Sequence, residues 1–378
     1  MGLFTEEQLS IKKLAQDLAK KEIAPRAAEY DRTEEFPWEN IKKMTEMGLM
    51  GLPIPEKYDG AETDFLSYIM VVEEISKACA STGVALAVHT SLAMGAILEF
   101  GNDEQRDKFI PPMARGEKLG AFALTEANAG SDASELATTA KLDGDDYVLN
   151  GTKVFITNGA SAETFLIFAT IDKSKGLKGI TGFIVDKATP GFSVGKKEEK
   201  MGIRASSTTE IILENCRVPK ANMLGKEGEG FKLAMKILDA GRIGVAAQAL
   251  GIAQAAYEEA LNYSKVRVQY GKPVSAFQGV SFMLADMAIQ IEAARGLVYN
   301  VARLKNDGEP YGKEAAIAKT FASDTAVKVA LDAIQIMAGY GYSREYPVER
   351  LLRDAKITQI YEGTNQIQRV VISNYILK

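Results

Sequence analysis

The hydrophobic pattern of this chain changes its period twice, and this change constrains the fold more than any single motif does. Apolar residues recur at helical spacing in the first and the last third of the 378 residues. Between these parts, short runs rich in Ile, Val, Phe and Thr alternate with turn residues, as they do in β-strands. We therefore predict a multidomain α+β protein with a helical domain over 1–120, an antiparallel β domain over 121–228 and a second helical domain over 229–378.

Local signals predict where some of the elements begin and end. Thr5 and Gln8 have the spacing of a capping box and predict the start of the first helix. The dipeptide Asn150-Gly151 stands between two apolar runs and predicts a hairpin turn. The two prolines at 111–112 predict the end of a short helix, because proline lacks the backbone N–H that a helix interior uses.

The composition excludes several classes of function. The net charge of -5 argues against a nucleic-acid surface, because phosphate binding requires a surplus of Lys and Arg. Cys79 and Cys216 are too few for a disulfide framework or a zinc cluster. His89 is the one histidine, so no multi-histidine metal site is expected, and its apolar neighbours predict a packed core residue. No apolar run approaches the ~20 residues that span a bilayer. We expect a cytoplasmic protein that binds no metal and no membrane.

The common phosphate-binding loops are absent from the sequence. The stretch "GKEGEGFK" lacks the terminal Gly-Lys-Ser/Thr of a P-loop. The stretch "GYGY" at 339–342 follows a helical run rather than a strand, so it does not have the context of a dinucleotide fingerprint. A nucleotide cofactor would therefore have to bind in another way.

Four stretches carry a resemblance to a known family. They are "FALTEANAGSD" at 122–132, "KVFITNG" at 153–159, "GIRASSTTEIILENCRVP" at 202–219 and "IYEGTNQIQ" at 360–368. Together with "RVQYGKP", "QIMAGYGY" and "RDAKI", they resemble, in this order, the acyl-CoA dehydrogenase family of flavoenzymes. The resemblance is nearest to short-chain, butyryl-CoA-type members from anaerobic bacteria. It implies a C-terminal four-helix bundle, FAD held non-covalently between that bundle and the β domain, and a homotetramer.

The resemblance assigns a role to Glu362, which stands directly before a Gly-Thr break. In the family this Glu removes the α proton of an acyl thioester, while flavin N5 takes the β hydride. The structural alternative is a solvated carboxylate at a helix end capped by Gly363, although a negative charge there is unfavourable with the helix dipole. Some relatives place the base on a bundle helix, where this chain has Gly241. The resemblance therefore leaves Glu362 as the base.

The resemblance also implies a set of cofactor contacts. The flavin would be lined by Phe122, Leu124, Thr125, Gly130, Ser131, Phe155, Ile156 and Thr157, with Thr364 and Gln366 following the base. Residues Arg267, Gln278, Gln335 and Gly339 would contact the FAD of a neighbouring subunit. Without the motifs, Phe155 would be interpreted as a strand core aromatic and Arg267 as a surface charge.

The implied substrate contacts are Ser131, Asp239, Arg242, Tyr361 and Gly363. For Asp239 and Arg242 the structural alternative is an ion pair between residues three apart on one helix. Tyr361 could equally be a core residue.

Three functional hypotheses follow. The first is a short-chain acyl-CoA dehydrogenase that converts butyryl-CoA to crotonyl-CoA and passes electrons to an electron-transferring flavoprotein. The second is an acyl-CoA oxidase of the same fold, and the third is a non-catalytic acyl-CoA-binding protein. The sequence does not fix the acyl chain length.

Overall fold

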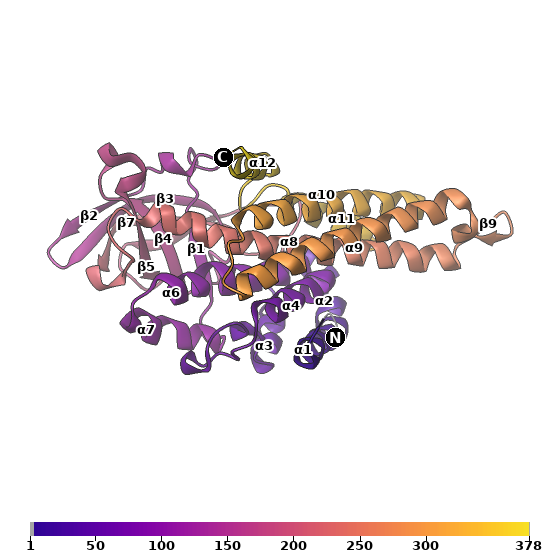
Figure 1. The fold of residues 1–378 in the computed structure, drawn as a ribbon, viewed down its shortest axis with the longest axis horizontal. Helices are drawn as coiled ribbons and strands as arrows, with labels where there is room; N and C mark the ends of the chain where they lie inside the picture. Colours follow the sequence, from indigo (N-terminus) through magenta and orange to yellow (C-terminus); the bar gives the residue numbers. More distant parts are fainter. Residues whose placement is uncertain (1–3, 378) are drawn as a thin grey trace.

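A β-sheet lies at one end of an elongated helical assembly in the computed structural model, which describes residues 4–377 (Figure 1). The N-terminal helices lie beneath the junction of sheet and bundle in this view. The order helical, β, helical is the one that the hydrophobic period predicted.

The N-terminal part consists of short helices. They are α1 Glu6–Leu18, α2 Ala24–Thr33, α3 Trp38–Glu46, α4 Phe65–Ala78, α5 Ala80–Ala87, α6 Gly95–Phe100 and α7 Asp103–Ala114. The predicted capping box is confirmed, because the Thr5 side chain accepts a hydrogen bond from the Gln8 N–H and the Gln8 side chain accepts one from the Thr5 N–H. Two π-helical turns, Ala19–Ile23 and Val88–Met94, join α1 to α2 and α5 to α6.

Two expectations about this part were wrong. The prolines at 111–112 do not end α7, which includes both and continues to Ala114. They lie in the last turn, where their carbonyls still accept hydrogen bonds from Arg115 and Lys118. The expectation that no apolar run approaches membrane-spanning length was also wrong. The segment Ala80–Phe100 has 21 residues and is apolar enough to cross a membrane by length and composition. However, 78% of an 18-residue stretch of this segment is buried inside the protein, as in a core helix.

The central part is one eight-stranded sheet with the path β6-β7-β3-β2-β4-β5-β8, in which β1 pairs with β4. Its strands are β1 Gly120–Ala123, β2 Thr139–Asp143, β3 Asp146–Ile156, β4 Thr164–Thr170, β5 Ile180–Asp186, β6 Phe192–Lys197, β7 Thr209–Pro219 and β8 Met223–Leu224. Most strand pairs are antiparallel as predicted. However, β1 pairs with β4 in parallel, and β2 also pairs with β4 in parallel, at a single residue pair. The sheet is therefore mixed.

The prediction of a hairpin turn at Asn150-Gly151 was wrong. Both residues lie inside β3, where the register against β7 shifts by a bulge. The turn between β2 and β3 lies at Gly144, which has a φ of 64°. Gly151 is required for a different reason, because an added Cβ would lie 2.7 Å from the Cα of Thr138. Asn-Gly tolerates unusual backbone angles, and a bulge needs that tolerance as much as a turn does.

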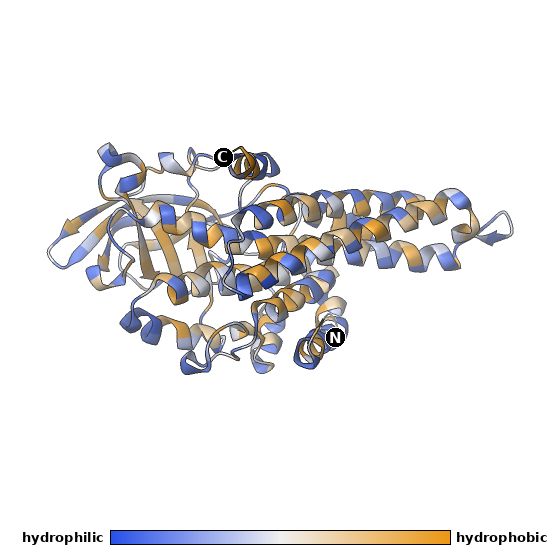
Figure 2. Cartoon of the chain, viewed as in Figure 1, coloured by the Kyte–Doolittle hydropathy of each residue, from blue (hydrophilic) through white to orange (hydrophobic). Residues whose placement is uncertain are grey.

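The C-terminal part is a bundle around one long helix. Its elements are α8 Gly230–Val266, the small hairpin β9 Val268–Gln269 and β10 Lys272–Pro273, α9 Gln278–Asn306, α10 Gly312–Met337, α11 Val348–Thr358 and α12 Asn365–Ile376. Helix α8 packs against α4, α9, α10 and α11. Both polar and apolar residues follow each bundle helix, as expected for amphipathic helices (Figure 2). Gly251 allows α8 to approach α4, since a Cβ there would lie 2.3 Å from the Glu73 carbonyl oxygen.

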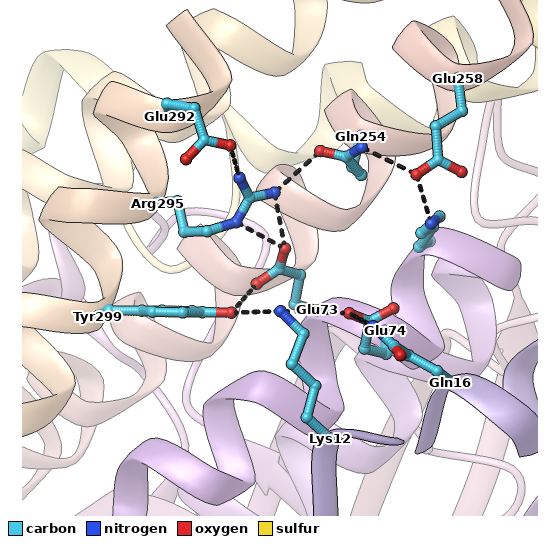
Figure 3. Close-up of polar contacts among 10 residues, drawn as sticks. Lys12, Gln16, Glu73, Glu74, Gln254, Glu258, Glu292, Arg295 and Tyr299 are labelled. Atoms are coloured by element: carbon cyan, nitrogen blue, oxygen red, sulfur yellow. Dashed lines mark hydrogen bonds and ion pairs between the residues drawn. The ribbon is translucent and has the colours of Figure 1, made fainter. Parts of the chain in front are cut away.

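A buried polar cluster joins the N-terminal helices to the bundle (Figure 3). Glu73 of α4 is 2% exposed and accepts hydrogen bonds from Arg295 at 3.1 and 3.2 Å and from the Tyr299 hydroxyl at 2.6 Å. Arg295 also donates to Gln254 of α8, and Lys12 of α1 donates to Tyr299. The charge of Glu73 is thus compensated by groups from α9, and the cluster fixes α1, α4, α8 and α9 together.

We expect Arg295→Met to lower the free energy of unfolding by about 3–5 kcal/mol, because it leaves the carboxylate of Glu73 buried without its cation. Urea unfolding followed by circular dichroism measures this change. The matched control is Arg217→Met, which removes a half-exposed arginine paired with Asp143 and Asp146 and should cost no more than about 1 kcal/mol. Equal losses in the two variants would contradict the role of the cluster.

Candidate active site

Glu362 lies in the turn between two helices. Helix α11 ends at Thr358 and α12 begins at Asn365, and between them Glu362 and Gly363 have φ angles of 52° and 90°. Thr364 caps α12, since its hydroxyl oxygen accepts a hydrogen bond from the Ile367 N–H at 3.2 Å. The Gly-Thr break in the sequence therefore marks a helix start, preceded by two consecutive left-handed residues.

The Glu362 carboxylate packs directly on α8. A Cβ built on Gly241 would lie 2.0 Å from Oε2 of Glu362 and 2.5 Å from Cδ2 of Leu92. No side chain fits at position 241 while the carboxylate occupies this place. The space beside position 241 of α8 is thus filled by a carboxylate that comes from the α11–α12 turn.

The surroundings of Glu362 make it basic. Its Oε2 is buried and has no hydrogen-bond partner among residues 4–377. Burial raises the pKa of Glu362 to about 7, while the positive charges of Lys319 and Arg242 act in the opposite direction. A carboxyl group with this pKa can accept a proton at neutral pH.

Two cavities meet at this carboxylate. The smaller, of about 180 Å³, lies between the β-domain loops and α8. The larger, of about 530 Å³, extends from the same loops to α11 and the segment 200–208. Thr125, Ser131 and Glu362 line both. The Glu362 carboxylate can therefore contact a ligand in either cavity.

A buried ion pair holds the β-domain loop that forms the shared wall. Lys153 of β3 is fully buried and donates to Glu126 Oε1 at 2.7 Å and to the Leu124 carbonyl at 3.1 Å. Burial lowers the pKa of Lys153 to about 8. Burial alone would raise the pKa of Glu126, but the charge and hydrogen bond of Lys153 and backbone N–H donors hold it below its usual value. The pair ties the loop to the sheet.

The wall of the larger cavity is apolar and locally strained. Phe155 and Ile203 both have positive φ angles, 57° and 44°. Such angles are rare for a bulky or β-branched residue and cost about 1–3 kcal/mol each. The Ile203 N–H donates to the buried carboxylate of Asp354 at 2.5 Å, which holds its segment against α11. Phe155 is 64% exposed, so it is not the strand core aromatic that its position in the sequence would otherwise indicate.

The structure brings the predicted flavin residues of the β domain together. The two cavities are lined by Phe122, Leu124, Thr125, Gly130, Ser131, Phe155, Ile156 and Thr157. Thr364 lines the larger cavity, whereas Gln366 is exposed on α12 and lines neither.

The predicted substrate residues lie around the smaller cavity. Ser131, Arg242, Tyr361 and Gly363 line it. Asp239 does not line it but forms a close ion pair with Arg242, as the structural alternative proposed. Arg242 is 5% exposed, and its Nε is buried without a hydrogen-bond partner among the described residues. The Tyr361 hydroxyl forms a close hydrogen bond with Gln248, which fixes its ring in the wall.

The remaining predicted cofactor residues lie at the other end of the molecule. Arg267 and Gly339 line a separate cavity of about 540 Å³, where the guanidinium lies 5.5 Å from the ring centre of Tyr340. Gln278 begins α9 and Gln335 lies in the last turn of α10, both exposed. At about 1.5 Å per residue, α8 carries Arg267 roughly 40 Å from Gly241. At this distance Arg267 cannot contact a ligand at Glu362 of the same chain.

Sequence reasoning missed three residues of the site: Leu92, Lys153 and Lys319. Leu92 lies on the π-helical turn and contacts the Gly241 position. Lys319 had a usable signal, because it stands on a helix face whose other members, such as Ala315, Ala322 and Ala326, are small and apolar. A lysine on such a face requires a buried partner.

Comparison with known proteins follows the same three-part division. The chain matches the N-terminal domain of acyl-CoA dehydrogenase over residues 5–117, the middle domain over 121–216 and the C-terminal domain over 228–377. The chain belongs to the acyl-CoA dehydrogenase family. Members of this family are flavin-dependent oxidoreductases, and FAD is the cofactor.

Close relatives of this acyl-CoA dehydrogenase span its whole length. The short-chain-specific acyl-CoA dehydrogenase of Clostridium acetobutylicum is 54% identical over 99% of both chains. The butyryl-CoA dehydrogenase structure from Megasphaera elsdenii has a TM-score of 0.98 and 51% identity, and the alignment covers 100% of both chains. A chain from the structural work on the electron transferring flavoprotein of Acidaminococcus fermentans has a TM-score of 0.99 and 54% identity over 100% of both.

The larger cavity fits the flavin of this family. Its walls include Phe155, Met201 and Ile360, which are 64%, 60% and 47% exposed and are covered by no other part of the described chain. Exposed apolar groups lining one cleft are expected where a flat, largely apolar ring binds. The hydroxyls of Thr125 and Thr157 lie in the same wall and can hydrogen-bond the ring edge.

The raised pKa of Glu362 predicts a pH-dependent stability difference. Because the folded-state pKa of about 7 exceeds the ordinary value of 4.5, this group contributes stability below pH 4.5 that is lost as the pH rises through 7. Glu362→Gln cannot ionise, so it should be more stable than the wild type at pH 8, by about 1–3 kcal/mol, and not at pH 4.5. Urea unfolding at both pH values measures this. Glu199→Gln, at an exposed position, serves as the control, and a gain for Glu362→Gln that is equal at both pH values would contradict the burial of an ionising carboxyl.

Proposed function

We propose that this protein oxidises short-chain acyl-CoA thioesters between the α and β carbons, converting butyryl-CoA to crotonyl-CoA. The observation that carries the proposal is the carboxylate of Glu362, which lines both cavities and whose Oε2 is buried without a partner among the described residues. A base at this place can reach a thioester in the smaller cavity while a flavin occupies the larger one.

The proposed reaction uses two groups of the turn. The Glu362 carboxylate takes the α proton, and its burial favours this because the protonated form is neutral. The backbone N–H of Glu362 donates no hydrogen bond within residues 4–377. It is therefore available for the thioester carbonyl, where it would stabilise the negative charge that develops as the proton leaves. The missing side chain of Gly363 leaves room beside this carbonyl.

When bound, FAD supplies the two-electron acceptor for the β hydride. The β-domain residues Thr125, Ser131 and Thr157 would hold the ring, since their hydroxyls lie in the cavity wall. Arg267, Gln278, Gln335 and Gly339 are too far along the bundle to assist in the same chain. We propose that they hold the cofactor of a second subunit in a homotetramer, where the Arg267 guanidinium would pair with a phosphate.

Leu92 would set the length of the acyl chain. It lines the smaller cavity beside Gly241 of α8. The residues next to Leu92 and Gly241 in the chain, Ser91 and Ala240, line a separate cavity of about 380 Å³. We propose that the Leu92 side chain limits the space for the acyl chain, so that a butyryl chain fits and a longer chain is hindered.

We also propose an electron-transferring flavoprotein as the electron acceptor. The support is the similarity to the chain from the Acidaminococcus fermentans work. A cytoplasmic location is consistent with Cys79 and Cys216, which are both free and buried, because reducing compartments keep thiols in this state.

Replacing the base tests the proposed reaction. Glu362→Gln should retain FAD and lose kcat by on the order of 10³-fold or more, because a positioned base is removed. The wild-type kcat/KM should rise with pH through about 7, since Glu362 must lose its proton first. Dye reduction with butyryl-CoA measures both. Glu362→Asp keeps a carboxylate and should retain more activity than Glu362→Gln. Turnover of Glu362→Gln within tenfold of the wild type would refute this assignment.

Replacing the wall tests the chain length. The wild type should prefer butyryl-CoA over octanoyl-CoA, and Leu92→Ala should raise the octanoyl-to-butyryl ratio of kcat/KM at least about tenfold, because it enlarges the smaller cavity. Leu331→Ala, at an exposed site on α10, is the control. An unchanged ratio in Leu92→Ala would contradict the assignment of this wall. Consumption of oxygen with butyryl-CoA at a rate comparable to that of dye reduction would favour the alternative function of an acyl-CoA oxidase.

A further inference from the structure

A lysine lies buried beneath the turn that carries the base. Lys319 projects from α10, and its side chain has no solvent exposure. Its neighbours on the same helix face include Ala315, Ala316 and Ala322, which are also fully buried. An ammonium group in such surroundings is costly unless hydrogen bonds satisfy it. Its partners therefore indicate why the residue is there.

Both partners of Lys319 belong to the residues that follow the base. Its Nζ donates to the Gly363 carbonyl at 2.9 Å and to Asn365 Oδ1 at 2.9 Å. Asn365 is itself fixed, because its Nδ2 donates to Ser323 at 2.9 Å and to Asp324 at 2.8 Å. The ammonium thus connects the rigid helix α10 to the start of α12 and to the turn before it.

The turn needs this support because of its backbone. Glu362 and Gly363 are consecutive left-handed residues, and a glutamate adopts that conformation only when its surroundings hold it. Gln368 donates from Nε2 to both of their carbonyls, at 3.0 and 2.9 Å. Lys319 adds the second donor to the Gly363 carbonyl. These hydrogen bonds fix the direction in which the Glu362 side chain leaves the turn.

The lysine does not form an ion pair with the base. Its Nζ donates to the Gly363 carbonyl and to Asn365 Oδ1, and Oε2 of Glu362 remains without a partner among the described residues. A direct hydrogen bond would occupy the lone pair that has to accept the proton. Burial lowers the pKa of Lys319 to about 7, while the charge of Glu362 acts in the opposite direction. In its protonated form, the lysine stabilises the carboxylate form of Glu362 by its charge.

The other charged groups near Glu362 act more weakly than Lys319. Arg242 of α8 also lowers the pKa of Glu362, but to a smaller extent, and it is paired with Asp239 of the same helix. Asp324 of α10 accepts hydrogen bonds from Gln359 and Asn365 and pairs with Arg369 of α12. Tyr68 of α4 and Tyr361 are neutral at physiological pH, because burial raises the pKa of each phenol.

We propose that Lys319 is a positioning residue, which fixes the Glu362–Gly363 turn by its hydrogen bonds and, when protonated, favours the ionised form of the base. This inference rests on the proposed function of Glu362.

The test is Lys319→Met, assayed with bound FAD and butyryl-CoA between pH 5.5 and 9. We expect kcat to fall at least tenfold at pH 7 and the acidic limb of kcat/KM to move up by about one pH unit, as loss of a nearby opposite charge requires. A purely structural role would lower activity equally at all pH values and leave the limb in place. Lys328→Met removes an exposed lysine of the same helix, paired with Asp332, and should leave the profile unchanged.

A second variant covers the case in which Lys319→Met does not fold. Asn365→Asp is isosteric and sets a negative charge against Lys319, so it should move the acidic limb in the same direction. An acidic limb at the wild-type position in the folded variants would overturn the inference. The base assignment fails separately, by retained turnover in Glu362→Gln, so the two failures are distinguishable.

Discussion

The whole site depends on the burial of one carboxylate against a helix that has no side chain at the point of contact. Glu362 reaches α8 at Gly241, and there is no space for even one additional carbon atom between them. This contact removes water from Oε2 and raises the pKa of the carboxyl to about 7. The same contact connects the C-terminal turn, the bundle and the π-helical turn that carries Leu92.

The polar groups around this contact form supports rather than ligands. The Lys153–Glu126 pair holds the β-domain loop. Lys319 and Asn365 hold the Glu362–Gly363 turn. The Asp354 carboxylate holds the backbone N–H of Ile203. Each support is buried, and each bonds backbone groups of a segment that lines the cavities. Positions with unfavourable backbone angles, at Phe155, Ile203 and Glu362, lie in these segments. A site built in this way is organised before any ligand arrives, which is the condition for efficient electrostatic catalysis.

The length of α8 separates two functions of one chain. The base and the β-domain loops lie at its N-terminal half, while Arg267 lies just beyond its C-terminal end, roughly 40 Å away. A cofactor bound at one end of α8 cannot contact the residues at both ends. If the distal residues contact FAD, they contact that of another subunit, and an assembled oligomer is then required for a complete site.

The sequence by itself determined the three-part order of the fold and, through the resemblance of its motifs, the family and the residues that line the cavities. Periodicity is a local property, so the helices and strands could be predicted from neighbouring residues, whereas Asn150-Gly151 and the prolines at 111–112 were misinterpreted because a bulge and a last helical turn satisfy the same local preferences. Only the tertiary structure decided that the carboxylate of Glu362 packs against Gly241, that Leu92 lines the smaller cavity and that Lys319 donates to the Gly363 carbonyl. These contacts join residues far apart in the chain, and their energies come from burial and charge, which no local pattern encodes.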